Sequence, residues 1–540
     1  MLASVLRWID VNILSLGREL RLSYLPPLMV YIAFGISGLT SIVGSFYVKD
    51  YLSLSVSDLA ALGFWAGIPF VLKMPIGHVV DLIWRWKSWL VFLGAGLIAV
   101  SLLIMVGLLT DRAAMTAVMP PESWFRASVL LASVGYVIQD VVADAMTVEA
   151  VPRVDADGRP VSQEARKLMN TTMQTLGRVA VIGGLALVAA ANLYIFSDAV
   201  GLPAEEKAAI YRRVYLTALL IPLVSVAGIV LAWVLSRREL RRLLAQGVEP
   251  GKARELLLSQ PERPDPNWWI LGGSAIFVAF TLGMGFSEFA WNQEIIFAGS
   301  FAIIAFLIAK LTRELEPDAR ATLIGTVVVV FVYRAVPAAG DGLLWWEIDV
   351  LGFDEQFLAV LELIAGVLTL FGMFLFRRFM AVRSIAYVVG FLTIVGAILS
   401  LPILGLYHGL HEWTMAMTGG VIDARNIVIV NTALASPLGQ IAMIPMLAWI
   451  ANSAPANLKA TYFAVMASFT NLALSAAQLG TKYLNQIFVV QREVKDPTGA
   501  IKVAADYSQL GDLIVVGLII GLVVPLVAIV VVRSLGLKWA

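Results

Sequence analysis

The amino-acid sequence predicts an all-α, polytopic membrane protein with two six-helix bundles and two extra central helices, and three observations lead to this fold class. Of the 540 residues, 59% are hydrophobic and 14% are charged, whereas soluble domains carry roughly 25% charged residues. Apolar stretches of roughly 18–25 residues, each long enough to cross a bilayer, recur along the chain. Basic and acidic residues alternate between successive loops, as expected of a chain that threads back and forth through a membrane.

The apolar stretches divide the chain into five segments. Residues 1–22 precede the first stretch, and residues 23–235 form the predicted N-terminal six-helix bundle. An arginine-rich cytoplasmic linker at 236–267 leads to an extra helix pair at 268–312 and to a C-terminal six-helix bundle at 313–540. The predicted spans lie near 25–48, 58–77, 88–109, 124–148, 169–195, 213–235, 268–287, 294–311, 321–338, 356–376, 384–406, 426–452, 459–486 and 511–532.

The first segment, residues 1–22, predicts an amphipathic helix on the cytoplasmic membrane surface rather than a secretion signal. Its apolar side chains recur near helical spacing, and charged residues break the apolar run; they are Arg7, Asp10, Arg18, Glu19 and Arg21. Arginines at these positions suit the headgroup region of a bilayer. Packing of this helix against the bundle is an equally open interpretation.

Lysine and arginine placement predicts that both chain ends lie inside the cell. Loops after even-numbered spans are basic and therefore cytoplasmic; their residues include Arg85, Lys87, Arg153, Arg159, Arg166, Lys167, Arg237, Arg313, Arg320, Arg377, Arg378 and Arg383. The loop after the span at 321–338 falls on the opposite side and is acidic, with Asp341, Glu347, Asp349, Asp354 and Glu355. The topology has fourteen spans, and a re-entrant course of the short central pair is the alternative.

Composition excludes several classes of function. The net charge is +1 and no basic face forms, which argues against a nucleic-acid partner. The absence of cysteine excludes disulfides, thiol catalysis and cysteine metal sites. The three histidines, His78, His408 and His411, do not form a metal set, and no Walker loop precedes a helix. We therefore expect neither a cofactor nor a metal, and no enzymatic activity.

Polar residues inside the N-terminal spans are the first candidates for a functional site. Asp140 and Asp144 are four residues apart, so both lie on one helix face. Counting helix rise at about 1.5 Å per residue places Lys73 level with Asp144, and Arg178 level with Asp140. We predict a polar cluster of these four residues. It is either a site for substrate anchoring or proton coupling, or a salt-bridge network that holds a gate.

A second candidate is the loop between spans two and three, Gly77-x-x-x-Asp81-x-x-x-Arg85-x-Lys87. The glycine permits a tight turn and close helix contact. Asp81 can accept hydrogen bonds from a helix N-terminus or an arginine and so hold a cytoplasmic gate in one state. A solvated turn is the alternative.

The C-terminal bundle has fewer charges within its spans. Arg334 and Glu362 both lie within about two turns of the outer face by helix rise. We expect these two residues to pair with each other, and a role in substrate binding is the alternative.

Sequence motifs in both bundles carry a family resemblance. In the N-terminal half they are Val48-Lys49-Asp50-x-Leu52-x-Leu54-Ser55, Pro69-x-x-x-Lys73-x-x-x-Gly77-x-x-x-Asp81 and Asp140-Val141-Val142-Ala143-Asp144-Ala145. In the C-terminal half they are Trp345-Trp346, Leu351-Gly352-Phe353, Gln440-Ile441-Ala442-Met443-Ile444-Pro445 and Ala460-Thr461-x-Phe463-Ala464-x-Met466. With these motifs the chain resembles the folate–biopterin transporter family, a branch of the major facilitator superfamily.

The resemblance implies secondary active transport of folates or reduced pterins, with protons, across the cell (inner) membrane. Lys73, Asp81, Asp140, Asp144 and Arg178 stand where the family places polar groups of its N-terminal bundle. The chain departs from the family at Phe70, Val80 and 82–87, which leaves the substrate open. The expected partners are a small-molecule substrate, a proton and the lipid bilayer. The alternative function is a non-transporting membrane assembly factor, for pigments or a complex, on the same fold.

Overall fold

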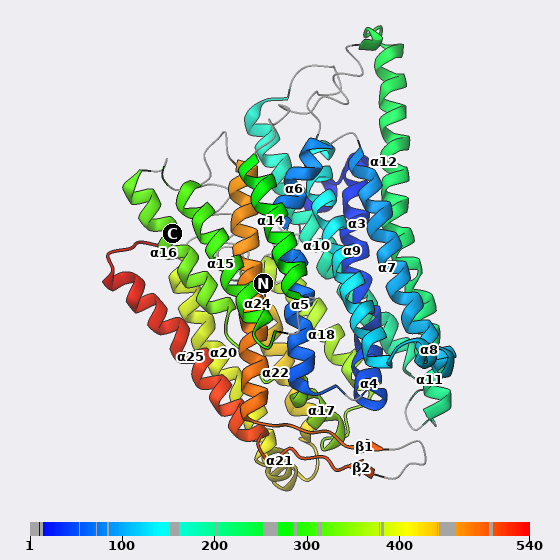
Figure 1. The fold of residues 1–540 in the computed structure, drawn as a ribbon, viewed down its shortest axis with the longest axis vertical. Helices are drawn as coiled ribbons and strands as arrows, with labels where there is room; N and C mark the ends of the chain where they lie inside the picture. Colours follow the sequence, from blue (N-terminus) through cyan, green and yellow to red (C-terminus); the bar gives the residue numbers. More distant parts are fainter. Residues whose placement is uncertain are drawn as a thin grey trace.

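The chain is mainly helical in the part that the computed structural model describes (Figure 1). The described residues are 10, 15–52, 54–71, 73–83, 86–151, 161–197, 199, 202, 204–251, 268–285, 289–311, 313, 316–376, 379, 383–439, 441, 459–495 and 501–539. Most of the predicted surface helix at 1–22 therefore lies outside the described residues, although the short helix α2 (Ser15–Arg18) belongs to it.

The N-terminal bundle contains several spans that are built from two consecutive helices. Proline and glycine interrupt these spans; for example, α5 carries Pro69 near its end and α6 begins at Lys73. The elements of this bundle are η2 (Leu22–Tyr24), α3 (Leu25–Gly35), η3 (Ile36–Thr40), α4 (Ser41–Tyr51), α5 (Val56–Val71), α6 (Lys73–Leu82), α7 (Lys87–Thr110), α8 (Arg112–Val118), α9 (Pro121–Ala150), α10 (Gln163–Ile195), α11 (Ala204–Ala218) and α12 (Leu220–Ala245).

The second half of the chain contains the central helix pair, the C-terminal bundle and a short hairpin. Two aspartates cap helices here: Asp354 accepts a hydrogen bond from the backbone N–H of Phe357, and Asp423 accepts one from Asn426. The elements are α14 (Trp268–Gly285), α15 (Asn292–Leu311), α16 (Pro317–Arg334), α17 (Asp341–Asp349), α18 (Glu355–Leu375), α20 (Ile385–Tyr407), α21 (Leu410–Thr418), α22 (Ala424–Ala435), η6 (Ser436–Leu438), α24 (Lys459–Ile487), β1 (Val494–Lys495), β2 (Ile501–Val503) and α25 (Leu510–Ser534).

The two bundles meet along two seams, one between α5 and α24 and one between α10 and α18. Small residues allow this approach: a Cβ added at Gly366 of α18 would lie 3.0 Å from the Cα of Ala186 on α10. In Figure 1, α25 and α16 lean away from α12 toward the top of the view, while α17, α21 and the hairpin lie at the bottom. We call the bottom end the outer face, following the prediction from the loop charges.

The central helix pair packs against both bundles. Helix α15 lies along α24, and α14 contacts α6. The side chain of Gln293 joins the two bundles, because its Nε2 donates to the carbonyl of Ala61 on α5 while its Oε1 accepts from Nζ of Lys482 on α24. Lys482 also donates to Glu294 at 2.9 Å. The pair is therefore attached at the seam between the bundles.

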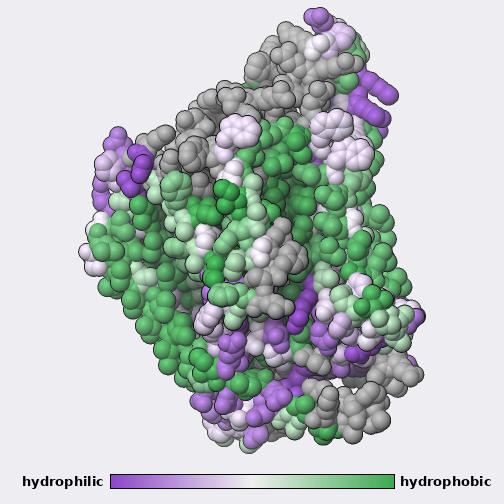
Figure 2. All heavy atoms as spheres, viewed as in Figure 1, coloured by the Kyte–Doolittle hydropathy of each residue, from purple (hydrophilic) through white to green (hydrophobic). Residues whose placement is uncertain are grey.

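The surface is consistent with a membrane protein. Figure 2 shows hydrophobic surface along the left and right flanks of the molecule, with hydrophilic residues gathered at the upper left, at the upper tip and toward the lower end. Eight helices of the described part are long and apolar enough to span a membrane, and shorter apolar helices include Val56–Val71 and Asn292–Phe306. The predicted fold class is confirmed, whereas the count of fourteen spans and the orientation of the termini stay predictions.

Helix α12 continues to Ala245 and so includes the first ten residues of the predicted linker at 236–267, because the arginines and leucines there are good helix formers. The domain boundaries stay predictions. The predicted outer loop after the span at 321–338 contains a helix, α17. Of the predicted span at 426–452, α22 and η6 are described, and residues 440 and 442–452 lie outside the described residues.

Candidate functional site

The predicted polar cluster forms around one lysine inside the N-terminal bundle. Lys73 is the first residue of α6, and its Nζ lies 2.7 Å from Oδ2 of Asp140 and 2.6 Å from Oδ2 of Asp144. Both carboxylates come from α9, one turn apart. The side chain of Lys73 is only 18% exposed, and that of Asp140 is 21% exposed. A single cation thus holds two carboxylates in a largely apolar setting, where unpaired charges are costly.

Tyr31 of α3 is a fourth member of this cluster. Its hydroxyl donates a hydrogen bond to Oδ1 of Asp144 at 2.5 Å, and the residue is 8% exposed. Its ring packs against Gly177 of α10, where an added Cβ would lie 3.0 Å from Cε2 of the tyrosine. Sequence reasoning missed Tyr31. The available signal was that its hydroxyl is the single side-chain polar group in α3.

Arg178 lies beside the cluster but does not bond to it. It follows Gly177 on α10 and interacts electrostatically with Asp140 and Tyr31. It also interacts with Arg334 at the end of α16, in the other bundle. Among the described residues, neither arginine has an ion pair or a hydrogen bond from its side chain. Two cations from opposite bundles therefore lie near each other, and neither has a directly bonded counter-ion among the described residues.

The expected pair between Arg334 and Glu362 is wrong. Glu362 of α18 accepts a hydrogen bond from the hydroxyl of Ser41 on α4, at 2.9 Å, whereas the charged neighbour of Arg334 is Arg178. Helix rise gave both residues a similar height but did not give the direction in which each side chain points. The bond between Ser41 and Glu362 instead links the two bundles.

The predicted gating loop is only partly described. Gly77 lies on α6, where an added Cβ would lie 3.9 Å from Cγ1 of Val141 on α9. Lys87 is the first residue of α7 and is 6% exposed. Arg85 and the side chain of Asp81 lie outside the described residues. The gating role of these four residues stays a prediction.

A set of ion pairs joins the two bundles at the outer face, and sequence analysis did not predict it. Lys49 at the end of α4 lies 2.5 Å from Asp349 at the end of α17. Asp349 also accepts a hydrogen bond at 2.6 Å from the hydroxyl of Tyr507. These contacts connect the first span of the N-terminal bundle to the outer helix of the C-terminal bundle.

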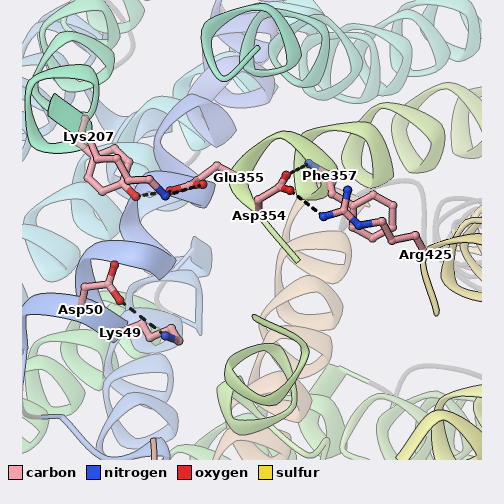
Figure 3. Close-up of polar contacts among 8 residues, drawn as sticks. Lys49, Asp50, Lys207, Asp354, Glu355, Phe357 and Arg425 are labelled. Atoms are coloured by element: carbon pink, nitrogen blue, oxygen red, sulfur yellow. Dashed lines mark hydrogen bonds and ion pairs between the residues drawn. The ribbon is translucent and has the colours of Figure 1, made fainter. Parts of the chain in front are cut away.

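The second outer connection centres on a fully buried carboxylate. Glu355, the first residue of α18, is 0% exposed and accepts from Lys207 at 2.9 Å and from Tyr211 at 2.6 Å, both on α11. Figure 3 shows Lys207 reaching across to Glu355. The neighbouring pair, Asp354 with Arg425 at 2.7 Å, stays within the C-terminal bundle. The sequence feature that could have indicated both ion pairs is the presence of opposite charges in separate outer loops.

Helix α17 places further ionisable groups at the outer face. Burial raises the pKa of Glu347 to about 7, and burial also raises the pKa of Asp341. Trp345 is 2% exposed, with the guanidinium of Arg492 at 5.1 Å from its ring centre. Burial lowers the pKa of Arg492. Among the described residues, no group of three or more metal-ligating side chains is placed to hold a metal ion.

Two helical bundles that enclose charged residues define the class: a polytopic membrane protein with the fold of major facilitator transporters. Within that class the chain belongs to the BT1 family, whose model matches residues 168–535. A curated relative from Synechocystis sp., named folate-biopterin transporter, is 22% identical over 454 residues, which cover 83% of this chain and 71% of the relative. The resemblance stated from the sequence motifs is confirmed.

Solved structures support the fold. A POT family transporter in complex with 5-aminolevulinic acid superimposes with a TM-score of 0.58 at 13% identity, over 95% of this chain and 96% of the other. The nucleoside transporter NupG superimposes with a TM-score of 0.51 at 11% identity, over 94% of this chain and 99% of the other. At these identities the similarity concerns the fold alone.

Proposed function

We propose that this chain is a secondary active carrier of the inner (cell) membrane that moves a folate- or pterin-like organic anion together with protons, by alternating access. The observation that carries the proposal is the intramembrane cluster of Lys73, Asp140 and Asp144. Charged groups at this depth are costly and commonly mark substrate or proton pathways. The relative named folate-biopterin transporter supports the substrate class.

The cluster has a charge balance that suits proton coupling. One lysine faces two carboxylates, so the group carries one excess negative charge when both acids are ionised. Two carboxylates that share a site raise each other's proton affinity. Binding of one proton makes the cluster neutral and weakens the electrostatic attraction between the carboxylates of α9 and Lys73 of α6. Proton binding can therefore change the contact between two helices of the N-terminal bundle.

The two arginines provide the complementary site for an anion. Arg178 and Arg334 come from opposite bundles and repel each other in the absence of a counter-ion. A carboxylate placed between them would relieve this repulsion and accept bidentate hydrogen bonds from a guanidinium. The bound anion would then contact both bundles. This supports a substrate with at least one carboxylate and favours a carrier over an assembly factor.

The outer contacts supply one side of an alternating-access cycle. Lys49 with Asp349, and Lys207 with Glu355, tie the bundles together at the outer face. In the transport cycle these pairs would break when the site opens outward. Carriers of this kind rock one bundle against the other around a central site. We infer that the present arrangement is closed on the outside.

The test is uptake of labelled folate and a labelled pterin into proteoliposomes with an imposed inward proton gradient. We expect the native protein to accumulate at least one compound, and Arg178→Gln and Arg334→Gln to lower uptake at least tenfold. Arg126→Gln is the matched control, because Arg126 is an exposed arginine on α9. Equal uptake by all four proteins, or no gradient-driven uptake of either compound by folded native protein, would refute the proposal.

A further inference from the structure

The two carboxylates of the cluster differ in how many hydrogen-bond donors they meet. Both oxygens of Asp144 are occupied, since Oδ1 accepts from Tyr31 at 2.5 Å and Oδ2 lies 2.6 Å from Nζ of Lys73. Asp140 accepts from Lys73 through Oδ2 at 2.7 Å. Within the described part of the chain, no donor lies within hydrogen-bond distance of its other oxygen, Oδ1. The pair is therefore asymmetric even though one lysine serves both acids.

This asymmetry determines which of the two carboxylates, Asp140 or Asp144, can be protonated at the lower cost in free energy. Hydrogen bonds to an ionised carboxylate favour the ionised form. A proton added to Asp144 would weaken two contacts, those from Tyr31 and Lys73, because a neutral acid is a poorer acceptor than a carboxylate. A proton added to Oδ1 of Asp140 weakens one contact, that from Lys73, and leaves the two contacts of Asp144 intact. The side chains of Asp140 and Asp144 are 21% and 38% exposed, so water can reach both acids and the hydrogen bonds alone distinguish them.

We propose that Asp140 is the carboxylate that takes up the proton, and that Tyr31 is a positioning residue that holds Asp144 ionised. This inference deepens the proposed function and rests on its proton coupling. The proton adds to Oδ1 of Asp140 and converts a carboxylate to a neutral acid, so no other bond is made or broken. Asp144 then remains the single counter-ion of Lys73.

The surroundings of Asp140 are consistent with this division of roles. The charged and titratable groups that face it are Lys73 from α6, Asp144 from its own helix, Tyr31 from α3 and Arg178 from α10. Helices α5 and α7 also pack against α9, and they contribute apolar side chains there, including Phe70 and Val91. The proton acceptor thus lies between an apolar wall and the arginine assigned to the substrate.

The position of Tyr31 is fixed by packing rather than by its hydrogen bond alone. Its ring lies on the bare backbone of Gly177, one residue before Arg178. The tyrosine therefore connects α3, α9 and α10 at the level of the cluster. Loss of its hydroxyl should leave the ring in place and remove one donor from Asp144. Because a hydrogen bond to a charged group is lost, Asp144 should bind a proton about tenfold more tightly.

The experiment is an infrared titration of the purified full-length protein in lipid, which follows the C=O stretch of protonated carboxylic acids without substrate or transport. Difference spectra compare the native protein with Asp140→Asn, Asp144→Asn and Tyr31→Phe. Tyr24→Phe is the matched control, because Tyr24 is a buried tyrosine just before α3. Size-exclusion elution and circular dichroism establish that each variant is folded.

We expect acidification of the native protein to produce a band that is missing in Asp140→Asn. Asp144→Asn should keep this band but shift it to lower pH, because Asp140 is then the single counter-ion of Lys73. Tyr31→Phe should add a second band, as Asp144 binds a proton about tenfold more tightly, and Tyr24→Phe should match the native protein. If Asp140→Asn does not fold, Asp140→Glu should shift the band in frequency. A band that persists in Asp140→Asn or disappears in Asp144→Asn would overturn the assignment, and an unchanged Tyr31→Phe spectrum would overturn the role of Tyr31.

These outcomes are separate from those of the transport assay. Failure of folate or pterin uptake would remove the proposed substrate and leave the infrared bands unchanged. A band assigned to Asp144 would overturn the inference even if gradient-driven uptake is strong.

Discussion

Replacement of Glu355 by glutamine should weaken the closure of the outer face. The carboxylate is fully buried and accepts two contacts from Lys207, at 2.9 and 3.2 Å, and one from Tyr211. Glutamine keeps an acceptor for the tyrosine but removes the charge opposite Lys207. A hydrogen bond to a charged group is worth about 1.5–3 kcal/mol. The equilibrium between outward-closed and outward-open forms should therefore shift by about 10- to 100-fold.

The absence of native cysteine makes the assay direct. Single cysteines at Val118 of α8 and Met417 of α21, which are 77% and 70% exposed, can carry a pair of spin labels at the outer ends of the two bundles. Pulsed electron spin resonance then measures the distance between the labels. Glu355→Gln should add a population at longer distances that is scarce in the native protein.

Arg425→Gln is the matched control for this prediction. It breaks an ion pair with Asp354, the neighbour of Glu355, but both partners belong to the C-terminal bundle (Figure 3). The control should leave the distance distribution unchanged. A native-like distribution in Glu355→Gln, or equal broadening in both variants, would refute the interpretation of Glu355 as part of an outer gate.

Three further predictions concern stability, measured by unfolding of the purified protein. Burial raises the pKa of Glu347 to about 7 from its ordinary 4.5, so the free energy of unfolding of the native protein should fall as pH rises between these values. The stability gained by Glu347→Gln should therefore grow over this range and level off above it. A stability difference that does not change with pH would contradict this prediction. Gly184→Ala should destabilise the protein because the new Cβ would lie 2.9 Å from the Cα of Gly35. The adjacent Gly183→Ala places its Cβ in open space and should stabilise α10. Equal effects of the two substitutions on stability would contradict the close packing at Gly184. Glu294→Gln should cost about 1.5–3 kcal/mol, because Glu294 accepts from Lys482, and unchanged unfolding would show that this attachment of α15 contributes nothing.

Residue spacing along single helices was enough to predict the core of the candidate site. Asp140 and Asp144 share a helix face because they are four residues apart, and helix rise brought Lys73 to their level. The structure joins all three. Tyr31 was missed because a tyrosine in an apolar helix shows no pattern, and its contact with Asp144 depends on how α3 and α9 pack.

Contacts between helices could not be predicted in the same way. Depth in the membrane gave Arg334 and Glu362 a similar height, but their rotation about the helix axes depends on neighbours in both bundles, and they do not pair. The outer ion pair of Lys49 depends on α17, a helix within a predicted loop. Its short helix brings Asp349 to Lys49 of the other bundle. The acidic character of this segment was visible in the sequence, but its partners were not.

The central claim, that a proton moves with the substrate through Asp140, is tested most directly by proton entry during transport. Proteoliposomes loaded with a pH-sensitive dye and given no proton gradient receive folate from outside. We predict that the native protein acidifies the lumen as folate enters, and that Asp140→Asn still exchanges labelled for unlabelled folate but produces no acidification. Folate entry without acidification by the native protein, or acidification that persists in Asp140→Asn, would contradict the account.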